Sequence, residues 1–154
     1  MNKGFTLIEL ILVMGITSLL IALGSVSFFS SYKSTNLNAA TEVLIADLRS
    51  QQSRAMSGES LGGSPVDSWG IKINADSYTL FANNYDQSNQ NNRVVDLPDG
   101  YALSSTFPSS GQIKFARGTG EIIGFINGQD TITLSNLGSN RIIELNPYGI
   151  IIGD

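Results

Sequence analysis

Hydrophobic residues run almost without interruption from Phe5 to Phe29. The polar side chains in this stretch are those of threonine and serine and of one glutamate, Glu9. A helix over these residues would be about 37 Å long, which is enough to cross a bilayer. The pattern therefore predicts a transmembrane helix over residues 5–29. It also places a carboxylate near the start of that helix, where burial in hydrocarbon costs about 2.5–3.5 kcal/mol.

The hydrophobic pattern changes after Phe29. Residues 30–57 contain no proline or glycine, and apolar residues recur at spacings of three, four and seven, as they do on one face of a helix. We expect one amphipathic helix that continues the preceding span and packs its apolar stripe on a globular domain. The residues of this stripe are Leu37, Ala40, Leu44, Leu48 and Ala55.

Residues 58–154 show short apolar or alternating runs that are separated by turn residues. Such runs are typical of antiparallel strands, so we expect a β-rich globular domain and an α+β fold for the whole chain. The pair Asn127-Gly128 is the strongest hairpin signal of the domain. The nine predicted strands are 69–74, 77–83, 93–97, 101–107, 112–116, 121–126, 130–136, 141–145 and 149–152.

The composition argues against catalysis. The chain has no cysteine and no histidine, so it lacks thiolate nucleophiles, the commonest general base and the commonest metal ligand. Asp76, Asp96 and Asp99 lie beside turns, where turn chemistry explains them, and no run offers the closely spaced oxygen ligands of a calcium loop. We expect no enzymatic activity, no cofactor and no metal site.

The charge of the globular domain argues against nucleic-acid binding. Residues 58–154 carry five basic and ten acidic side chains, a net charge of −5 within a chain total of −4. An acidic domain repels phosphate backbones. Trp69, Tyr78 and Phe81 could form an aromatic ligand site, but their alternating strand positions favour packing in the core.

A secretory signal peptide is an alternative interpretation of the first residues. Cleavage after Gly24 would release a soluble β-domain protein that begins at Ser25. Glu9 at the start of the apolar stretch argues against it, as does the continuation of that stretch to Phe29. A plain membrane anchor would leave Glu9 unexplained.

The segment GFTLIEL, residues 4–10, resembles the processing and methylation motif of type IV pilins and type II secretion pseudopilins. The resemblance implies that a prepilin peptidase cuts after Gly4 and methylates the new amino terminus at Phe5. It also implies that Glu9 faces the methylated amine of a neighbouring subunit as a filament assembles. Thr6 could hydrogen-bond Glu9 from one turn away.

The chemistry of these positions suits such a role. Glycine has no side chain, so a protease can approach the backbone after Gly4 closely. Cleavage removes Lys3 and creates an amine at Phe5. Attraction between this amine and Glu9 of a neighbour strengthens in a low dielectric, and either charge is penalised if it stays unpaired. The pair would therefore favour one axial register between packed helices.

Two further features indicate a minor subunit. Val26 and Ser27 stand where major pilins commonly have a proline. A long helix before a cysteine-free β domain resembles the GspH/FimT-type minor subunits, including the stretches 112–115 and 141–149. Some minor pilins of this type take up DNA through an arginine-containing C-terminal segment. No arginine follows Arg141 here, so DNA uptake remains an alternative only.

These features combine into one expectation. The chain is a structural minor subunit of a type IV pilus or a type II secretion pseudopilus. Its parts are a leader peptide (1–4), a transmembrane and filament-core helix (5–29), an amphipathic helix (30–57) and a β-rich domain (58–154). It sits in the inner membrane as a single-pass protein, with the C-terminal domain on the non-cytoplasmic side, and then joins a filament. Its partners are the prepilin peptidase/methyltransferase, other pilin or pseudopilin subunits and membrane lipid.

Overall fold

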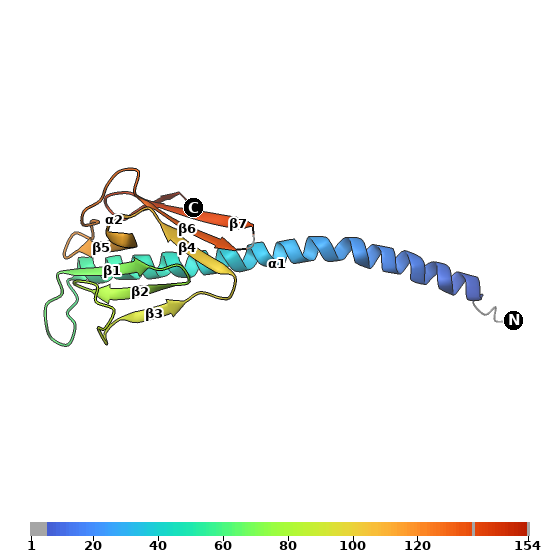
Figure 1. Ribbon diagram of the computed structural model, residues 1–154, viewed down its shortest axis with the longest axis horizontal. Coiled ribbons are helices and arrows are strands. Elements are labelled where there is room, and N and C mark those ends of the chain that lie inside the picture. The colour runs from blue at the N-terminus through green and yellow to red at the C-terminus, as the bar shows by residue number, and fades with distance from the viewer. Residues whose placement is uncertain (1–5, 137, 154) are drawn as a thin grey trace. The chain divides into compact units, whose positions relative to one another are not determined.

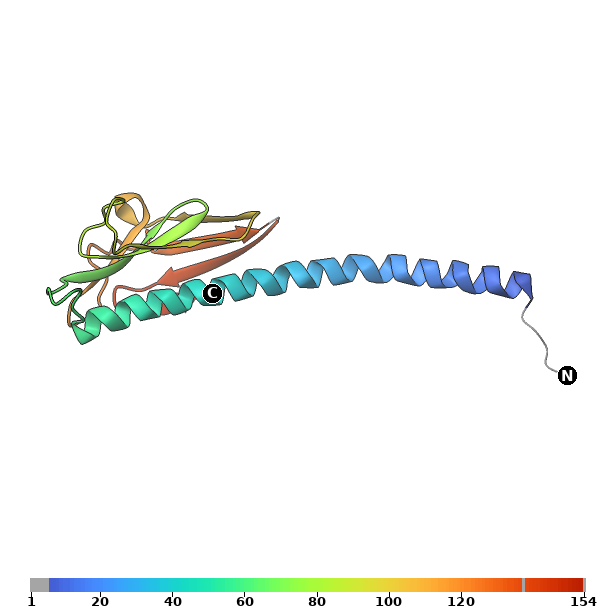
Figure 2. The ribbon, with the colours of Figure 1, turned by 90° about the horizontal axis from the view of Figure 1, so that it is seen from below.

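The computed structural model describes residues 6–136 and 138–153, and for residues 23–35 it describes the backbone alone. The chain divides into two compact units, Met1–Asn36 and Leu37–Asp154. One helix, α1 (Leu7–Ser57), contributes to both units. The eight strands that the structure describes all belong to the second unit, where they gather along the C-terminal part of α1 (Figures 1 and 2). The predicted α+β fold is confirmed.

A glycine ends α1 where the sequence predicts. Gly58 has a φ of +66°, in the left-handed region that glycine enters without a steric penalty. The amide of Gly58 donates to the carbonyl oxygen of Ala55, and the amide of Glu59 donates to that of Arg54, both at 3.1 Å. This pair of bonds is a Schellman motif, which satisfies carbonyl groups that the last turn of a helix leaves without partners.

The predicted apolar stripe of α1 forms the helical side of the core. Leu37, Leu44, Leu48 and Ala55 are each at most 2% exposed, and Ala40 packs against them in part. The expectation for this stripe is confirmed. The stripe is wider than predicted, because three further residues on the same side of the helix are buried: Thr41, Ile45 and Gln51.

Two four-stranded antiparallel sheets complete the domain (Figure 1). In the first sheet the spatial order is β3-β2-β1-β5, and in the second it is β4-β6-β7-β8. The strands of the first sheet are β1 (Ser68–Ile73), β2 (Ser77–Ala82), β3 (Arg93–Asp96) and β5 (Gln112–Ala116). Those of the second are β4 (Tyr101–Ser105), β6 (Thr131–Asn136), β7 (Ser139–Leu145) and β8 (Ile151–Gly153). A single turn, α2 (Pro108–Gly111), precedes β5.

Alternation along the strands builds the core between the sheets and α1. In the first sheet Ile71 lies opposite Leu80 on one side and Ile113 on the other, and in the second sheet Ile132 lies opposite Ile143. Each of these five side chains is at most 7% exposed. The period of two places successive side chains on opposite faces, so one face of each sheet is apolar.

One predicted strand, residues 121–126, is wrong. Only Ile122 pairs there, in an isolated bridge with Phe115. Gly124 then takes a φ of +70° and turns the chain out of the sheet. Because no strand precedes Asn127-Gly128, this pair is a turn before β6 and does not close the hairpin that the sequence suggests. The six-residue run EIIGFI is apolar without strict alternation, which makes its register weak.

Close backbone approaches fix how loops pack on α1 and β1. The side-chain nitrogen Nε2 of Gln52 donates to the carbonyl oxygens of Gly120 (3.1 Å) and Tyr148 (2.6 Å). A Cβ atom at Gly149 would lie 2.6 Å from Nε2 of Gln52. A Cβ at Gly70 would lie 2.5 Å from the carbonyl oxygen of Ile113. Glycine is therefore required at these contacts by the space available.

Candidate assembly site at the start of α1

Thr6 and Glu9 form a reciprocal pair at the start of α1. The hydroxyl of Thr6 donates to Oε2 of Glu9 at 3.0 Å, and the Thr6 amide donates to the same oxygen at 3.2 Å. The amide of Glu9 in turn donates to Oγ1 of Thr6 at 3.3 Å. With α1 beginning at Leu7, Thr6 is the N-cap and Glu9 is the third helical residue. This arrangement is a capping box, which satisfies amide groups that the first turn leaves without helical acceptors.

The capping box changes how Glu9 can be understood. A glutamate in the first turn also interacts favourably with the positive end of the helix dipole. Within the chain, therefore, the carboxylate has a structural role that needs no second subunit. The two hydrogen bonds that Thr6 donates both go to Oε2 of Glu9. Among the described residues, nothing donates to Oε1. The carboxylate is exposed, so this second oxygen is accessible to an external donor.

The first turns of α1 expose apolar side chains around the whole helix. Leu10, Ile11, Leu12, Val13 and Met14 are consecutive, cover more than one full turn and are each at least 55% exposed. A helix that is apolar on every side is stable when other protein or lipid covers it. Other described side chains of the same kind are Leu7, Ile8, Ile16, Leu19, Leu20 and Ile21.

The polar side chains of this segment are satisfied within the helix. The hydroxyl of Thr17 donates to the carbonyl oxygen of Val13 at 2.7 Å, and that of Ser18 donates to Met14 at 2.8 Å. Such bonds to the carbonyl four residues earlier remove the need for water at a hydroxyl group. Both side chains can therefore be covered by an apolar environment at little cost.

The structure describes part of the predicted processing and membrane region. It brings Thr6 and Glu9 together, whereas Gly4 and Phe5 lie outside the described residues, as do the side chains of residues 23–29. Within the described part of the chain, no helix carries an apolar stretch long enough to cross a membrane.

The structure also places the other candidate residues. Trp69, Tyr78 and Phe81 are each at most 4% exposed, which confirms the prediction that they pack inside the domain. The Nε atom of Arg141 donates to Oδ1 of Asn38 on α1 at 2.8 Å. Among the described residues, no three acidic side chains come close enough together to hold a metal ion.

Comparison with known proteins bears on the first residues. Residues 1–25 match the family described as the prokaryotic N-terminal methylation motif. The match supports a type IV pilin-like family. In such a pilin-like chain the motif implies processing by a prepilin peptidase and assembly with other pilin subunits. It indicates a structural subunit rather than an enzyme. No curated protein and no solved structure matches the chain.

The capping box could have been anticipated from the spacing of Thr6 and Glu9, because a threonine followed three residues later by glutamate before an apolar run is its signature. Gln51 is the residue that sequence reasoning missed. Its position between Leu48 and Ala55 on the buried stripe was the available signal, since a polar residue there must find a partner.

Proposed function

We propose that the chain is a structural minor subunit of a type IV pilus or of a type II secretion pseudopilus. The observation that carries this proposal is the N-terminal methylation motif over residues 1–25. Two properties of the chain support it. The start of α1 has an apolar surface, and Glu9 in the first turn has a carboxylate oxygen, Oε1, that accepts no hydrogen bond from the described residues. The absence of cysteine and of proline at Val26-Ser27 supports the rank of minor subunit or pseudopilin.

Each of the four segments of the chain has a role in the proposed processing and assembly. Residues 1–4 are a leader on the cytoplasmic side, removed by cleavage after Gly4. Residues 5–29 anchor the chain once across the inner membrane and later enter the filament core. Residues 30–57 carry the globular domain, 58–154, on the non-cytoplasmic side. Copies or related subunits join head to tail, which generates an open filament instead of a closed ring.

Glu9 acts as the register element of this assembly. The methylated amine of Phe5 from a neighbouring subunit pairs with Glu9, whose Oε1 is available while Oε2 stays in the capping box with Thr6. In a low dielectric the attraction between the two charges is strong, and either charge is costly if it stays unpaired. A neighbour that slides by one helical turn loses this pair, so the pair selects one axial position.

Processing can be tested on protein recovered from its native host. We expect intact mass and amino-terminal sequencing to find N-methylated Phe5 as the first residue. A mature terminus at Ser25, or an uncut Met1, would contradict the proposal. Gly4→Val should block cleavage by placing a side chain at the scissile bond, whereas Gly15→Ala is the matched control, because nothing lies within 4 Å of a Cβ at Gly15.

The rank can be tested on filaments purified from the same cells. A minor subunit should be present at a small fraction of the major subunit by quantitative mass spectrometry. An abundance equal to that of the most abundant pilin would refute minor rank and leave the pilin-type assignment intact.

A further inference from the structure

Asn127 and Gly128 form the tip of an exposed turn that leads into β6. The amide of Gln129 donates to the carbonyl oxygen of Ile126 at 3.0 Å, which closes the turn, and Gly128 takes a φ of +80°. Glycine suits this position because the left-handed region carries no steric penalty for it. Both central residues are exposed, so water reaches the peptide bond between them.

The side chain of Asn127 is available for reaction. It forms no hydrogen bond with any described residue. Its Cγ atom is an amide carbon, and the backbone nitrogen of the next residue can attack this carbon to close a succinimide ring. Gly128 has no side chain that would hinder the approach. The pair therefore supplies the two groups that spontaneous deamidation requires, an accessible side-chain amide and an unhindered backbone nitrogen.

Asp130 holds the backbone N–H group of Gly128. The amide of Gly128 donates a hydrogen bond to Oδ2 of Asp130 at 3.1 Å. Asp130 is only 8% exposed, and its own carbonyl oxygen accepts a hydrogen bond from the amide of Leu145 on β7 at 3.0 Å. The ladder between β6 and β7 begins at the next residue, where Thr131 lies opposite Glu144. The second sheet therefore fixes this carboxylate beside the Gly128 nitrogen.

The charge of Asp130 opposes the first step of deamidation. The Gly128 nitrogen becomes a strong nucleophile only when it loses its proton, and the resulting anion would lie next to the carboxylate. A like charge at hydrogen-bond distance disfavours the charged form of a group. The folded chain therefore slows a reaction for which the sequence supplies both groups, and removal of the Asp130 charge should accelerate it.

We propose that Asn127 is a site of spontaneous deamidation and that Asp130 keeps the reaction slow in the folded chain. A base from the solvent takes the proton of the Gly128 nitrogen, which then attacks Cγ of Asn127. A new C–N bond closes the succinimide ring, while the bond from Cγ to Nδ2 breaks and Nδ2 takes up a proton and leaves as ammonia. Water then adds to either carbonyl of the ring and opens it to aspartate or to isoaspartate. The reaction consumes one water molecule, releases one ammonia and involves no oxidation or reduction.

The product changes the entrance to β6. Each reacted chain gains a negative charge close to Asp130, and the isoaspartate form also adds a carbon atom to the backbone before Gly128. A longer backbone does not preserve the geometry of the hydrogen bond between Gln129 and Ile126. We therefore expect the loop over residues 121–130 to loosen as the reaction proceeds.

The reaction can be followed on the purified full-length protein, aged in detergent at constant pH and temperature. Peptide mapping by mass spectrometry measures the loss of Asn127, and an isoaspartate methyltransferase detects the isoaspartate product, which direct hydrolysis of the side chain would not form. We expect both products at position 127, and a faster reaction in denaturant, where Asp130 is no longer held in place. Asn146 is an internal control, because the nitrogen of Pro147 carries no proton to lose.

One variant and a matched control test the role of Asp130. Asp130→Asn preserves the size of the side chain and an oxygen that can accept from Gly128, but it removes the charge. We expect the folded variant to lose Asn127 about tenfold faster than the parent chain, the effect of one charge at this distance near the protein surface. Glu144→Gln removes the charge of a neighbouring acidic residue that forms no hydrogen bond with Gly128, and it should react at the parent rate.

Each part of the proposal can be refuted. Absence of isoaspartate at position 127 even in the denatured chain would refute the modification site. Equal rates for Asp130→Asn and Glu144→Gln would refute the effect of the charge. Amide hydrogen exchange over residues 126–131 should be equal in these two variants, and an increase in Asp130→Asn that matches its faster deamidation would assign the effect to opening of the loop instead. None of these results bears on the proposed role in filament assembly, because that role rests on residues 1–25.

Discussion

The hydroxyl of Tyr78 on β2 donates a 2.6 Å hydrogen bond to Oδ2 of Asp47 on α1. It links the first sheet to the helix through a tyrosine that is 1% exposed. Burial raises the pKa of Tyr78 far above its usual range, and the hydrogen bond with Asp47 and the negative charge of that residue raise it further, while Arg93 acts in the opposite direction. The tyrosine therefore stays protonated at a pH where exposed tyrosines ionise.

This pKa predicts a loss of stability in alkali. The folded chain holds the Tyr78 proton more tightly than the unfolded chain, so the contribution is complete below the unfolded pKa of about 10. It falls as the pH rises above that value toward the folded pKa, by at most about 1.4 kcal/mol per pH unit. Denaturant unfolding at a series of alkaline pH values measures this decline.

The variant Tyr78→Phe isolates the contribution. We expect it to lower the free energy of unfolding at neutral pH by about 1–2 kcal/mol, through loss of the bond to Asp47, and to show a shallower alkaline decline than the parent chain. Tyr148→Phe is the control, because Tyr148 is 62% exposed. Parallel alkaline curves for Tyr78→Phe and the parent would contradict the raised pKa.

Gly70→Ala should destabilise the first sheet strongly. The new Cβ would lie 2.5 Å from the carbonyl oxygen of Ile113 and 2.8 Å from the Phe81 ring, so β1 and β5 would have to separate. Overpacking of this kind costs about 1–3 kcal/mol. Gly153→Ala in β8 is the matched control, since its Cβ would find only ordinary contacts beyond 3.4 Å. Thermal unfolding of the two variants measures this difference. Equal melting temperatures for Gly70→Ala and Gly153→Ala would refute the predicted overpacking at Gly70.

Gln52→Ala should loosen the C-terminal loop from α1. The substitution removes both bonds from Nε2, to the carbonyl oxygens of Gly120 and Tyr148. We expect a loss of about 1–2 kcal/mol in the free energy of unfolding. Amide hydrogen exchange should also become faster around residues 146–150. Ser53→Ala, at an exposed neighbouring position, should change neither measurement.

Substitutions at Glu9 can separate its two roles. Glu9→Gln keeps a side chain that can complete the capping box with Thr6, but it removes the charge. Glu9→Ala removes both the capping interaction and the charge, and Thr6→Ala removes the capping interaction alone. We expect all three variants to be cleaved after Gly4, and both Glu9 variants to assemble poorly or to be methylated less. Recovery of each variant in sheared filaments measures assembly, and mass spectrometry measures cleavage and methylation.

The outcome for Glu9→Gln distinguishes the two explanations. If it assembles as the parent chain does while Glu9→Ala does not, the capping box accounts for Glu9 and the charge pair is refuted. If Glu9→Ala assembles as well as the parent chain, neither the capping box nor the charge pair is needed for assembly, and both explanations are refuted.

Periodicity alone determined much of the architecture. The stripe from Leu37 to Ala55 and the stop at Gly58 follow from local geometry, because burying an apolar face and ending a helix at glycine depend on neighbours in sequence. Eight of the nine predicted strands exist for the same reason. The failure at residues 121–126 shows the limit, since an apolar run without alternation does not specify its own register.

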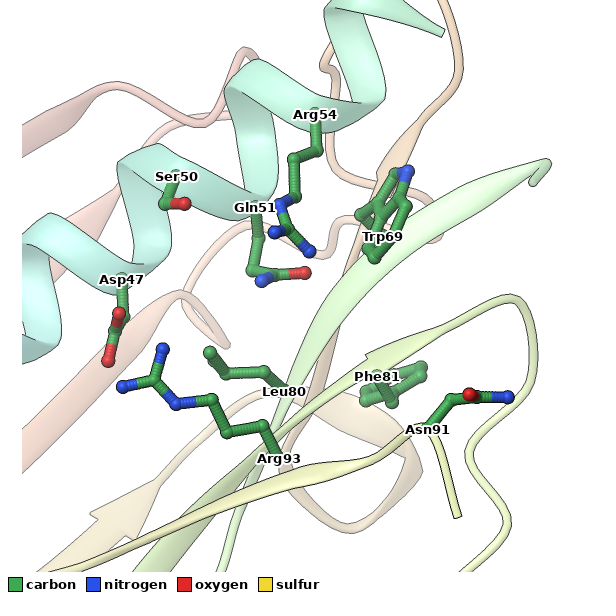
Figure 3. A pocket seen from close by; sticks show the side chains of 9 residues that line it. All are labelled: Asp47, Ser50, Gln51, Arg54, Trp69, Leu80, Phe81, Asn91 and Arg93. Atoms are coloured by element: carbon green, nitrogen blue, oxygen red, sulfur yellow. The ribbon is translucent and has the colours of Figure 1, made fainter. Parts of the chain in front are cut away.

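Only the tertiary structure decided which side chains meet across elements. Nothing in the sequence places Asp47 against Tyr78, or brings Gln51 and Arg93 to the lining of one pocket (Figure 3), because both depend on how α1 packs on the first sheet. Glu9 lies between these cases. Its spacing from Thr6 determines the capping box locally. Among the described residues no cation pairs with Glu9, and the proposed partner belongs to another subunit, which a single folded chain cannot show.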